Sequence, residues 1–188
     1  MSSCSWPGNN EILKQYHDKE WCIESFDDRY IFEMLTLEGA QAGLSWNIIL
    51  SKREEYKKSF DNFNIKYCSR LSDEDIEKIR EEYNVVKNLN KLKSVRINAL
   101  GVIEIQAEYG SFSNFLWRYV DFKPIINRWD SEKSVPAQSS ISGQISKDLK
   151  KRGFKFVGPV IMYSFMQAIG MVDDHIKTCP YHSLNRKL

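Results

Sequence analysis

The segment FEMLTLEGAQAGLSW, residues 32–46, combines a strong helical pattern with an acidic residue that falls inside it. Apolar residues here and just before it have the spacing of a helix with one face toward a core; they are Ile31, Met34, Leu35 and Ala42. Glu38 lies on the same face. Because an unpaired carboxylate costs several kcal/mol to bury, the pattern predicts either a charged partner for Glu38 or a site that uses its charge.

The size and composition of the chain indicate a soluble globular protein with one domain, or one domain with a small appendage. It has 188 residues, of which 42% are hydrophobic and 28% are charged, and both values are ordinary for such a domain. No apolar run approaches the roughly 20 residues that a membrane-spanning helix needs. The first residues lack the basic end and apolar core of a secretory signal, so we expect a cytoplasmic location.

Charge is distributed unevenly along the chain. Residues 1–86 carry 11 Lys and Arg against 17 Asp and Glu, a net charge of −6, whereas residues 87–188 carry 16 against 8, a net charge of +8. A basic half favours contact with a polyanion, and a solvated basic surface is the alternative. In the cytoplasm the cysteines are expected as reduced thiols or metal ligands; they are Cys4, Cys22, Cys68 and Cys179.

The first half of the chain predicts helices with recognisable N-terminal caps. Residues 10–21 form a short helix capped by Asn9 or Asn10. The next helix begins after Asp27 or Asp28, carries Glu38 and pauses within residues 39–43. A further helix is predicted over residues 46–60, and Ser72 with Asp75 forms an acidic capping-box pattern at the start of residues 71–83.

The second half continues the helical pattern. Residues 88–110 predict a long helix ending at Gly110, with Leu89, Leu92, Leu100 and Ile103 on one side. Residues 122–140 contain two prolines and several serines and predict a surface loop. Two closing helices are predicted over residues 142–154 and 157–172. The absence of alternating strand patterns therefore predicts an all-α fold of about eight helices.

Potential zinc ligands occur at both ends of the chain. Cys4 and His17 lie near the start, while His175 and Cys179 are four residues apart and share one face of a helical turn. Two thiolates and two imidazoles make a closed tetrahedral zinc site with no open position for catalysis. Cys22 or His182 is an alternative fourth ligand, and buried cysteines without metal are a further alternative.

Aromatic residues surround Glu38 in the predicted helices. Tyr16, Trp21 and Trp46 lie near it, and Trp6 is close to them in sequence. Indole and phenol rings can form a slot that stacks a planar ligand, and a cationic ligand gains further from the ring faces. The alternative is that these rings are core residues and that Glu38 either caps a helix or pairs with an arginine. The combination of acid and rings favours a ligand site.

Longer blocks of the sequence resemble a known family, the 3-methyladenine DNA glycosylases I, which are the constitutive bacterial branch of the helix-hairpin-helix glycosylases. The resemblance runs from Cys4 to Cys179 in consistent order. Besides residues 32–46, its blocks are YHDKEW (16–21), KREEY (52–56), FSNFLW (112–117), ISKDLKKRGFKFVGP (145–159) and SFMQAIGMVDDH (164–175).

The resemblance implies a monomeric, all-α repair enzyme that forms a single glycosylase domain over residues 1–188. Such enzymes bind double-stranded alkylated DNA, flip 3-methyladenine out of it, hydrolyse its N-glycosidic bond and leave an abasic site without nicking the strand. The implied place of action is the bacterial cytoplasm, at the nucleoid. Activity on 3-methylguanine or 7-methylguanine is left open.

The family's functional residues match positions in this sequence. The resemblance implies one structural Zn²⁺ per chain that joins the N- and C-terminal segments into a subdomain through Cys4, His17, His175 and Cys179. It implies a catalytic role for Glu38 and base binding by Tyr16, Trp46, Trp21 and Trp6. Residues 41–44 are the candidate wedge that fills the space of the flipped base.

The resemblance also implies a helix-hairpin-helix element near residues 72–108, with its turn at residues 84–87. This sequence departs from the family at Asn84, where glycine is usual, at Leu89, where arginine is usual, and at Leu13, where an aromatic residue is common. Asparagine also tolerates a left-handed conformation. A basic cluster that either contacts phosphates or is solvated comprises Lys150, Lys151, Arg152 and Lys155.

Two other functions are compatible with the same residues. One is a non-catalytic protein that binds alkylation damage on the same scaffold, which would bind modified duplex without releasing a base. The other is a zinc-dependent hydrolase, which requires a free coordination position on the metal. Four protein ligands would leave no such position.

Overall fold

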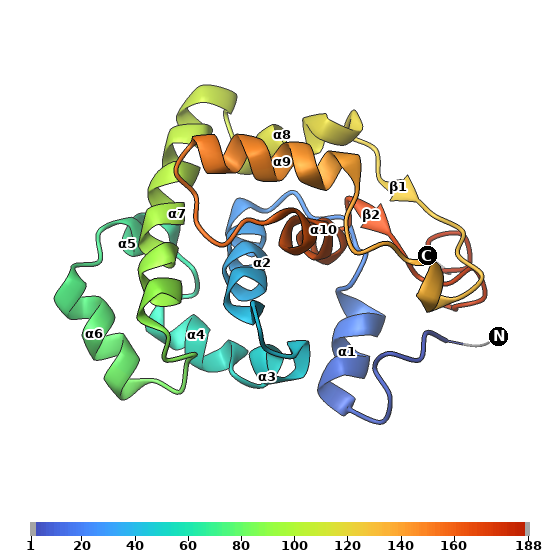
Figure 1. Cartoon of the computed structure of the whole chain (residues 1–188), viewed down its shortest axis with the longest axis horizontal. Helices are drawn as coiled ribbons and strands as arrows, with labels where there is room; N and C mark the ends of the chain where they lie inside the picture. The colour runs from blue at the N-terminus through green and yellow to red at the C-terminus, as the bar shows by residue number, and fades with distance from the viewer. Residues whose placement is uncertain (1–2, 187–188) are drawn as a thin grey trace.

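The computed structural model describes residues 3–186, and within them α-helices make up almost all of the regular structure (Figure 1). The predicted all-α class is therefore confirmed. The helices are α1 (Glu11–Lys19), α2 (Asp28–Gln41), α3 (Trp46–Ser51), α4 (Arg53–Ser59), α5 (Ile65–Ser69), α6 (Asp73–Glu82), α7 (Leu89–Tyr109), α8 (Phe112–Trp117), α9 (Ser140–Lys151) and α10 (Pro159–Ala168).

Helix α2 forms the centre of the molecule. It packs against α10 and α7, while α9 crosses α10 on the far side from α3 and α4 (Figure 1). All ten residues from Ile31 to Ala40 are buried, because α2 is surrounded by other helices and not only covered on one face. The apolar core continues into large rings such as Phe32, Trp117 and Phe165, each with 0% exposure.

Several predicted helix starts are confirmed by their capping hydrogen bonds. The Asn10 side chain accepts from the Leu13 amide, and Asp27 accepts from the Arg29 amide. Ser72 and Asp75 form the reciprocal capping box. Asp28 instead accepts from the Phe112 and Ser113 amides, both at 2.8 Å, and so links α2 to the start of α8.

Other elements differ from the prediction. The helix predicted over residues 46–60 is divided at Lys52 into α3 and α4. The predicted loop over residues 122–140 contains the strand β1 (Ile125–Ile126), which pairs in parallel with β2 (Val172–Asp173). The buried side of α7 passes through Leu92, Val95 and Val102, whereas Leu100 is 48% exposed. The predicted side was right for Leu92 and wrong for Leu100, because α7 is apolar around much of its circumference.

Distant parts of the chain meet on one side of the molecule. The segment before α1 and the segment after β2 lie close together beside α1 (Figure 1). Gly170, between α10 and β2, permits a close approach to the segment that follows α1. A Cβ atom on it would come within 2.3 Å of the backbone at Ile23 and Glu24. Within residues 3–186 no helix has the length and apolar character to cross a bilayer.

Candidate functional site

The predicted acid and rings line one cavity between α1, α2, α3 and α10. Its volume is about 250 Å³, just below the range of roughly 300–1,000 Å³ that is usual for ligand sites, and it is lined by Trp6, Tyr16, Trp21, Glu38, Gln41, Trp46, Ser164 and Gln167. The structure thus brings Glu38 together with all four predicted aromatic residues. The volume suits a small planar molecule.

Glu38 is held in place by the packing of α2 on both sides. Its neighbour Gly39 faces the backbone of the α9–α10 loop, where a Cβ atom would lie 3.2 Å from Cβ of Phe156. The end of α2 is held by Lys91, whose Nζ donates to the carbonyls of Ala40 at 2.8 Å and Ala42 at 2.6 Å. Glu38 therefore reaches the cavity from a rigid helix.

Glu38 is only 5% exposed as a residue, and its carboxyl group hydrogen-bonds to none of the residues within 3–186. The predicted alternative of an arginine partner is wrong, because Arg53 binds Glu33 at 2.6 Å and Glu20 at 2.9 Å instead. Burial raises the pKa of Glu38 to about 8. A cationic ligand in the cavity would reverse this effect by stabilising the ionised carboxylate.

The rings of the cavity pack edge to face and not as a closed stack. The Tyr16 and Trp46 centroids are 5.3 Å apart with an interplanar angle of 63°, and those of Trp6 and Trp21 are 5.2 Å apart at 74°. Burial, and then the charge of Glu38, raise the pKa of Tyr16 well above its usual value. Its hydroxyl group therefore remains a neutral donor.

Two indole N–H groups at the cavity are buried without a hydrogen-bond acceptor among residues 3–186. They are Nε1 of Trp6 and Nε1 of Trp46. A buried donor without a partner is costly, so these groups are suited to a ligand that brings acceptors.

A second hollow of about 200 Å³ adjoins the first and shares Glu38, Gln41 and Ser164 with it. Its other lining residues are Ala42, Gly43, Leu44, Val160 and Ile161. The predicted wedge, residues 41–44, therefore borders the cavity, and Leu44 at its end is 38% exposed. Gly43 has a φ of +78°, a turn conformation that favours glycine.

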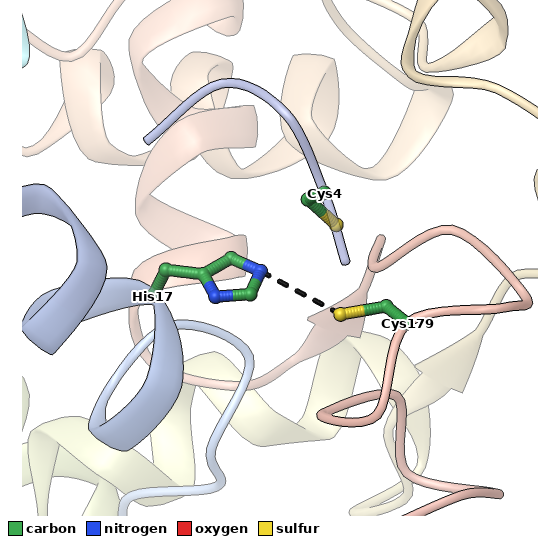
Figure 2. A group of neighbouring side chains, drawn as sticks. All are labelled: Cys4, His17 and Cys179. Atoms are coloured by element: carbon green, nitrogen blue, oxygen red, sulfur yellow. Dashed lines mark hydrogen bonds between the residues drawn. The ribbon is translucent and has the colours of Figure 1, made fainter. Parts of the chain in front are cut away.

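Three of the four predicted zinc ligands meet at the chain ends. The ligand atoms of Cys4, His17 and Cys179 all lie within 4.8 Å of one another (Figure 2). Nε2 of His17 is 3.7 Å from Sγ of Cys179, while its Nδ1 lies 2.6 Å from Asp18. Burial lowers the pKa of His17 and raises that of Cys4 to about 12.

The fourth predicted ligand, His175, lies directly beside this cluster. Its ring centroid is 4.8 Å from that of His17, and its Nδ1 lies 2.8 Å from Asp173. Although burial raises the pKa of Asp173, hydrogen bonds from His175 and Ser183 lower it to about 2. Nε2 of His175 is buried and has no partner among residues 3–186.

The alternative fourth ligands differ in position. Cys22 forms a neighbouring group with Asp173 and His175, again with ligand atoms within 4.8 Å. His182 is unsuited, because its Nε2 lies 2.8 Å from the Asn127 carbonyl and its Nδ1 accepts from the Leu184 amide at 3.1 Å. Of His175 and His182, only His175 therefore has a ring nitrogen, Nε2, that is available to bind a metal.

The turn between α6 and α7 is linked to α3 and α4 through Asn84. Lys52 donates to the side chain and carbonyl of Asn84, and the Asn84 amide donates to Glu55 at 3.4 Å. Asn84 does not adopt the left-handed conformation. The predicted basic cluster includes Arg152, which pairs with Glu108 at 2.7 Å. The charge of this residue therefore has a partner within the protein.

Sequence reasoning missed two polar residues of the cavity, Ser164 and Gln167, and predicted Gln41 only as part of the wedge, residues 41–44. Ser164 and Gln167 are three residues apart on α10 and therefore share one face, which was the available signal in an otherwise apolar helix. Leu13 packs against the core and is not a lining residue of the cavity.

Comparison with known proteins finds relatives along almost the whole chain. The methyladenine glycosylase family model matches residues 6–182. A DNA-3-methyladenine glycosylase of Haemophilus influenzae is 40% identical over 177 residues, covering 94% of this chain and 96% of that protein. DNA-3-methyladenine glycosylase 1 of Escherichia coli K12 is 37% identical over 179 residues, covering 95% and 96%.

A solved structure gives the same relationship in three dimensions. It is a point variant of 3-methyladenine DNA glycosylase I in complex with 3-methyladenine. The two chains are 36% identical and superpose with a TM-score of 0.94, over 97% of this chain and 98% of that one.

Proposed function

The chain belongs to the methyladenine glycosylase family, and on this premise we propose that its cavity binds the 3-methyladenine base of alkylated DNA. The protein acts in DNA base-excision repair by hydrolysing the N-glycosidic bond of this base, which leaves an abasic site. The observation that supports this most is the unpaired, buried carboxyl group of Glu38 in an aromatic cavity. A related protein of known structure holds 3-methyladenine.

Glu38 is the proposed catalytic residue. Methylation at N3 makes the purine cationic in DNA, so the base already leaves more easily than a neutral one. The flipped base would stack against Tyr16 and Trp46, with Trp6 and Trp21 completing the walls. The charge of an ionised Glu38 favours a cation over neutral adenine and holds the base while water attacks the sugar, which has oxocarbenium character.

The cluster at the chain ends fits a structural zinc site. The proposed ligands of one Zn²⁺ per chain are Cys4, His17, His175 and Cys179. Both histidines have Nδ1 on a carboxylate, Asp18 or Asp173, the arrangement that leaves Nε2 free for a metal. Zinc would supply positive charge that keeps two buried thiols ionised. The proposed zinc ion would join the N- and C-terminal segments of one glycosylase domain.

The two helices α6 and α7 with their turn, residues 83–88, are proposed as the helix-hairpin-helix element that holds double-stranded DNA. The contact of Asn84 with Glu55 predicts that phosphate competes with this carboxylate for the turn amide. Residues 41–44, at the edge of the cavity, are the proposed wedge. A monomer acting at the nucleoid in the bacterial cytoplasm stays a prediction.

The decisive experiment is chromatography of free bases released from methylated duplex DNA. Wild-type protein should release 3-methyladenine above all other bases, and Glu38→Gln should release at least about tenfold less, because one charge-assisted contact is lost. Glu33→Gln is the matched control, since Glu33 is a buried acid on the same helix but outside the cavity. Wild-type release by Glu38→Gln would exclude the catalytic role.

The same assay distinguishes the two other functions. A non-catalytic damage-binding protein would bind methylated or abasic duplex and release no base. A zinc hydrolase would lose its activity reversibly on chelation while the fold persists. For the glycosylase proposed here, chelation acts on stability and not on the chemistry.

A further inference from the structure

A second residue of the cavity is held in one orientation by a buried carboxylate. Gln167, in the last turn of α10, lines the cavity beside Glu38. Its Nε2 donates to Oδ2 of Asp174 at 2.7 Å. The Gln167 carbonyl accepts from the Cys22 amide at 2.9 Å, so the backbone of this residue is fixed as well as its side chain.

Asp174 acts in this arrangement only as an acceptor. It is 1% exposed, and Oδ2 also accepts from the Tyr163 hydroxyl at 2.7 Å. Its Oδ1 accepts from Asn127 at 2.7 Å and from Trp129 at 2.6 Å. Four donors on two carboxylate oxygens leave no proton for Asp174 to donate, so the Gln167 amide must present its NH₂ group to it.

The orientation of the amide follows from this constraint. With one N–H of its amide donated to Asp174, Gln167 keeps its oxygen Oε1 and one further N–H, and Oε1 is the only acceptor of this side chain. This oxygen can accept a hydrogen bond but cannot donate one. Exchange of the nitrogen and the oxygen would place two acceptors, Oε1 and Asp174, face to face, which is unfavourable for a buried pair.

We propose that Gln167 is a specificity-determining residue, whose amide oxygen accepts a hydrogen bond from the exocyclic amino group of the bound purine. Asp174 is then a positioning residue that keeps the oxygen on the cavity side. This rests on the proposed function and deepens it: the site selects a methylated purine with an amino group at the six position. A base with a carbonyl oxygen there would meet the Gln167 oxygen as a second acceptor.

The test compares the binding of two free bases, 3-methyladenine and 3-methylhypoxanthine, by quenching of the tryptophan fluorescence of the cavity. Wild-type protein should prefer 3-methyladenine. Gln167→Met, which keeps the length of the side chain, should lower the ratio of the two affinities by about tenfold, as expected for one lost hydrogen bond and one relieved repulsion. A ratio equal to that of wild type would overturn the proposal.

Gln106→Met is a matched control. Gln106 on α7 also donates Nε2 to a carboxylate, Oδ2 of Asp28, at 2.7 Å, but it does not line the cavity. This variant loses the same kind of bond and should keep the wild-type ratio. A purely structural role of Gln167 would lower the stability of both variants and change neither ratio. If wild-type protein binds no 3-methyladenine at all, the proposed function itself fails.

Discussion

At the scale of single residues, the most unusual feature is a buried acid that the protein leaves unpaired. Glu38 binds protons more tightly in the folded protein, with a pKa of about 8, than in the unfolded chain, where it is near 4.5. The free energy of unfolding therefore has its full value below pH 4.5 and falls as the pH rises toward 8. This is a cost in stability that a binding site can justify.

Glu38→Gln should remove this cost. Relative to wild type, the variant should gain stability between pH 5 and pH 8 by about 3 kcal/mol, because each pKa unit corresponds to about 1.4 kcal/mol. Urea unfolding of both proteins at several pH values measures the difference. Parallel pH profiles would show that the carboxyl group is not neutral in the folded protein.

The pH dependence of activity should run in the opposite direction. Only ionised Glu38 complements a cationic base, so kcat/KM for 3-methyladenine release should rise with pH up to about 8, by as much as about tenfold per pH unit. The Glu38→Gln variant should be flat over the same range. A wild-type profile that falls between pH 6 and 8 would contradict an anionic role for this residue.

The sequence allowed the burial of Glu38 to be predicted, because its position relative to Met34 and Ala42 places it on the apolar face of α2. It did not show whether an arginine would meet it, since the pairing of Arg53 with Glu33 depends on how α4 packs against α2. Gln167 was missed for a related reason: its role depends on Asp174, which lies beyond the end of α10.

At the scale of elements, helix starts could be predicted and helix faces only in part. Caps such as Ser72 with Asp75 are local, and the sequence contains all their atoms within four residues. The break at Lys52 has no proline or glycine to signal it. The exposed side of α7 at Leu100 depends on which helices pack around it, and a helix that is apolar on most sides carries little information about this.

The end of α2 depends on a contact from α7. Lys91 gives two short hydrogen bonds to carbonyls at the end of α2, and burial lowers its pKa. Lys91→Met should lower the free energy of unfolding by about 2 kcal/mol, because it leaves helix-terminal carbonyls without a donor. It should also reduce excision from DNA more than binding of free 3-methyladenine. The reason is that the proposed wedge, residues 41–44, begins at this end of α2 and would act only on DNA.

Lys93→Met provides the comparison for this prediction. Lys93 lies on the same helix and pairs with Asp73 at 2.7 Å at the surface, where such pairs contribute less than about 1 kcal/mol. Urea unfolding of the two variants should therefore separate them clearly. An equal loss of stability in both would mean that the contacts of Lys91 with α2 are unimportant.

At the scale of the whole molecule, residues from the two ends of the chain form the buried cluster beside α1. The sequence supplied the ligand types and the spacing of His175 and Cys179, but a distance of more than 150 residues separates them from Cys4 and His17. Their meeting depends on the complete fold, and the resemblance to a family, not spacing alone, predicted it. The structure brings three of the four together and places His175 next to them.

Loss of the proposed zinc should weaken the entire fold, because chain ends otherwise fray. Elemental analysis should find one zinc per chain in wild-type protein, less in Cys179→Ala, and a decrease in unfolding free energy of at least about 3 kcal/mol in this variant. Cys68→Ala is the control: Cys68 is buried and donates to the Phe60 carbonyl at 3.5 Å, far from the cluster in sequence. It should lose only about 1 kcal/mol of packing and keep its zinc. Equal zinc content in both variants would show that Cys179 is not a ligand.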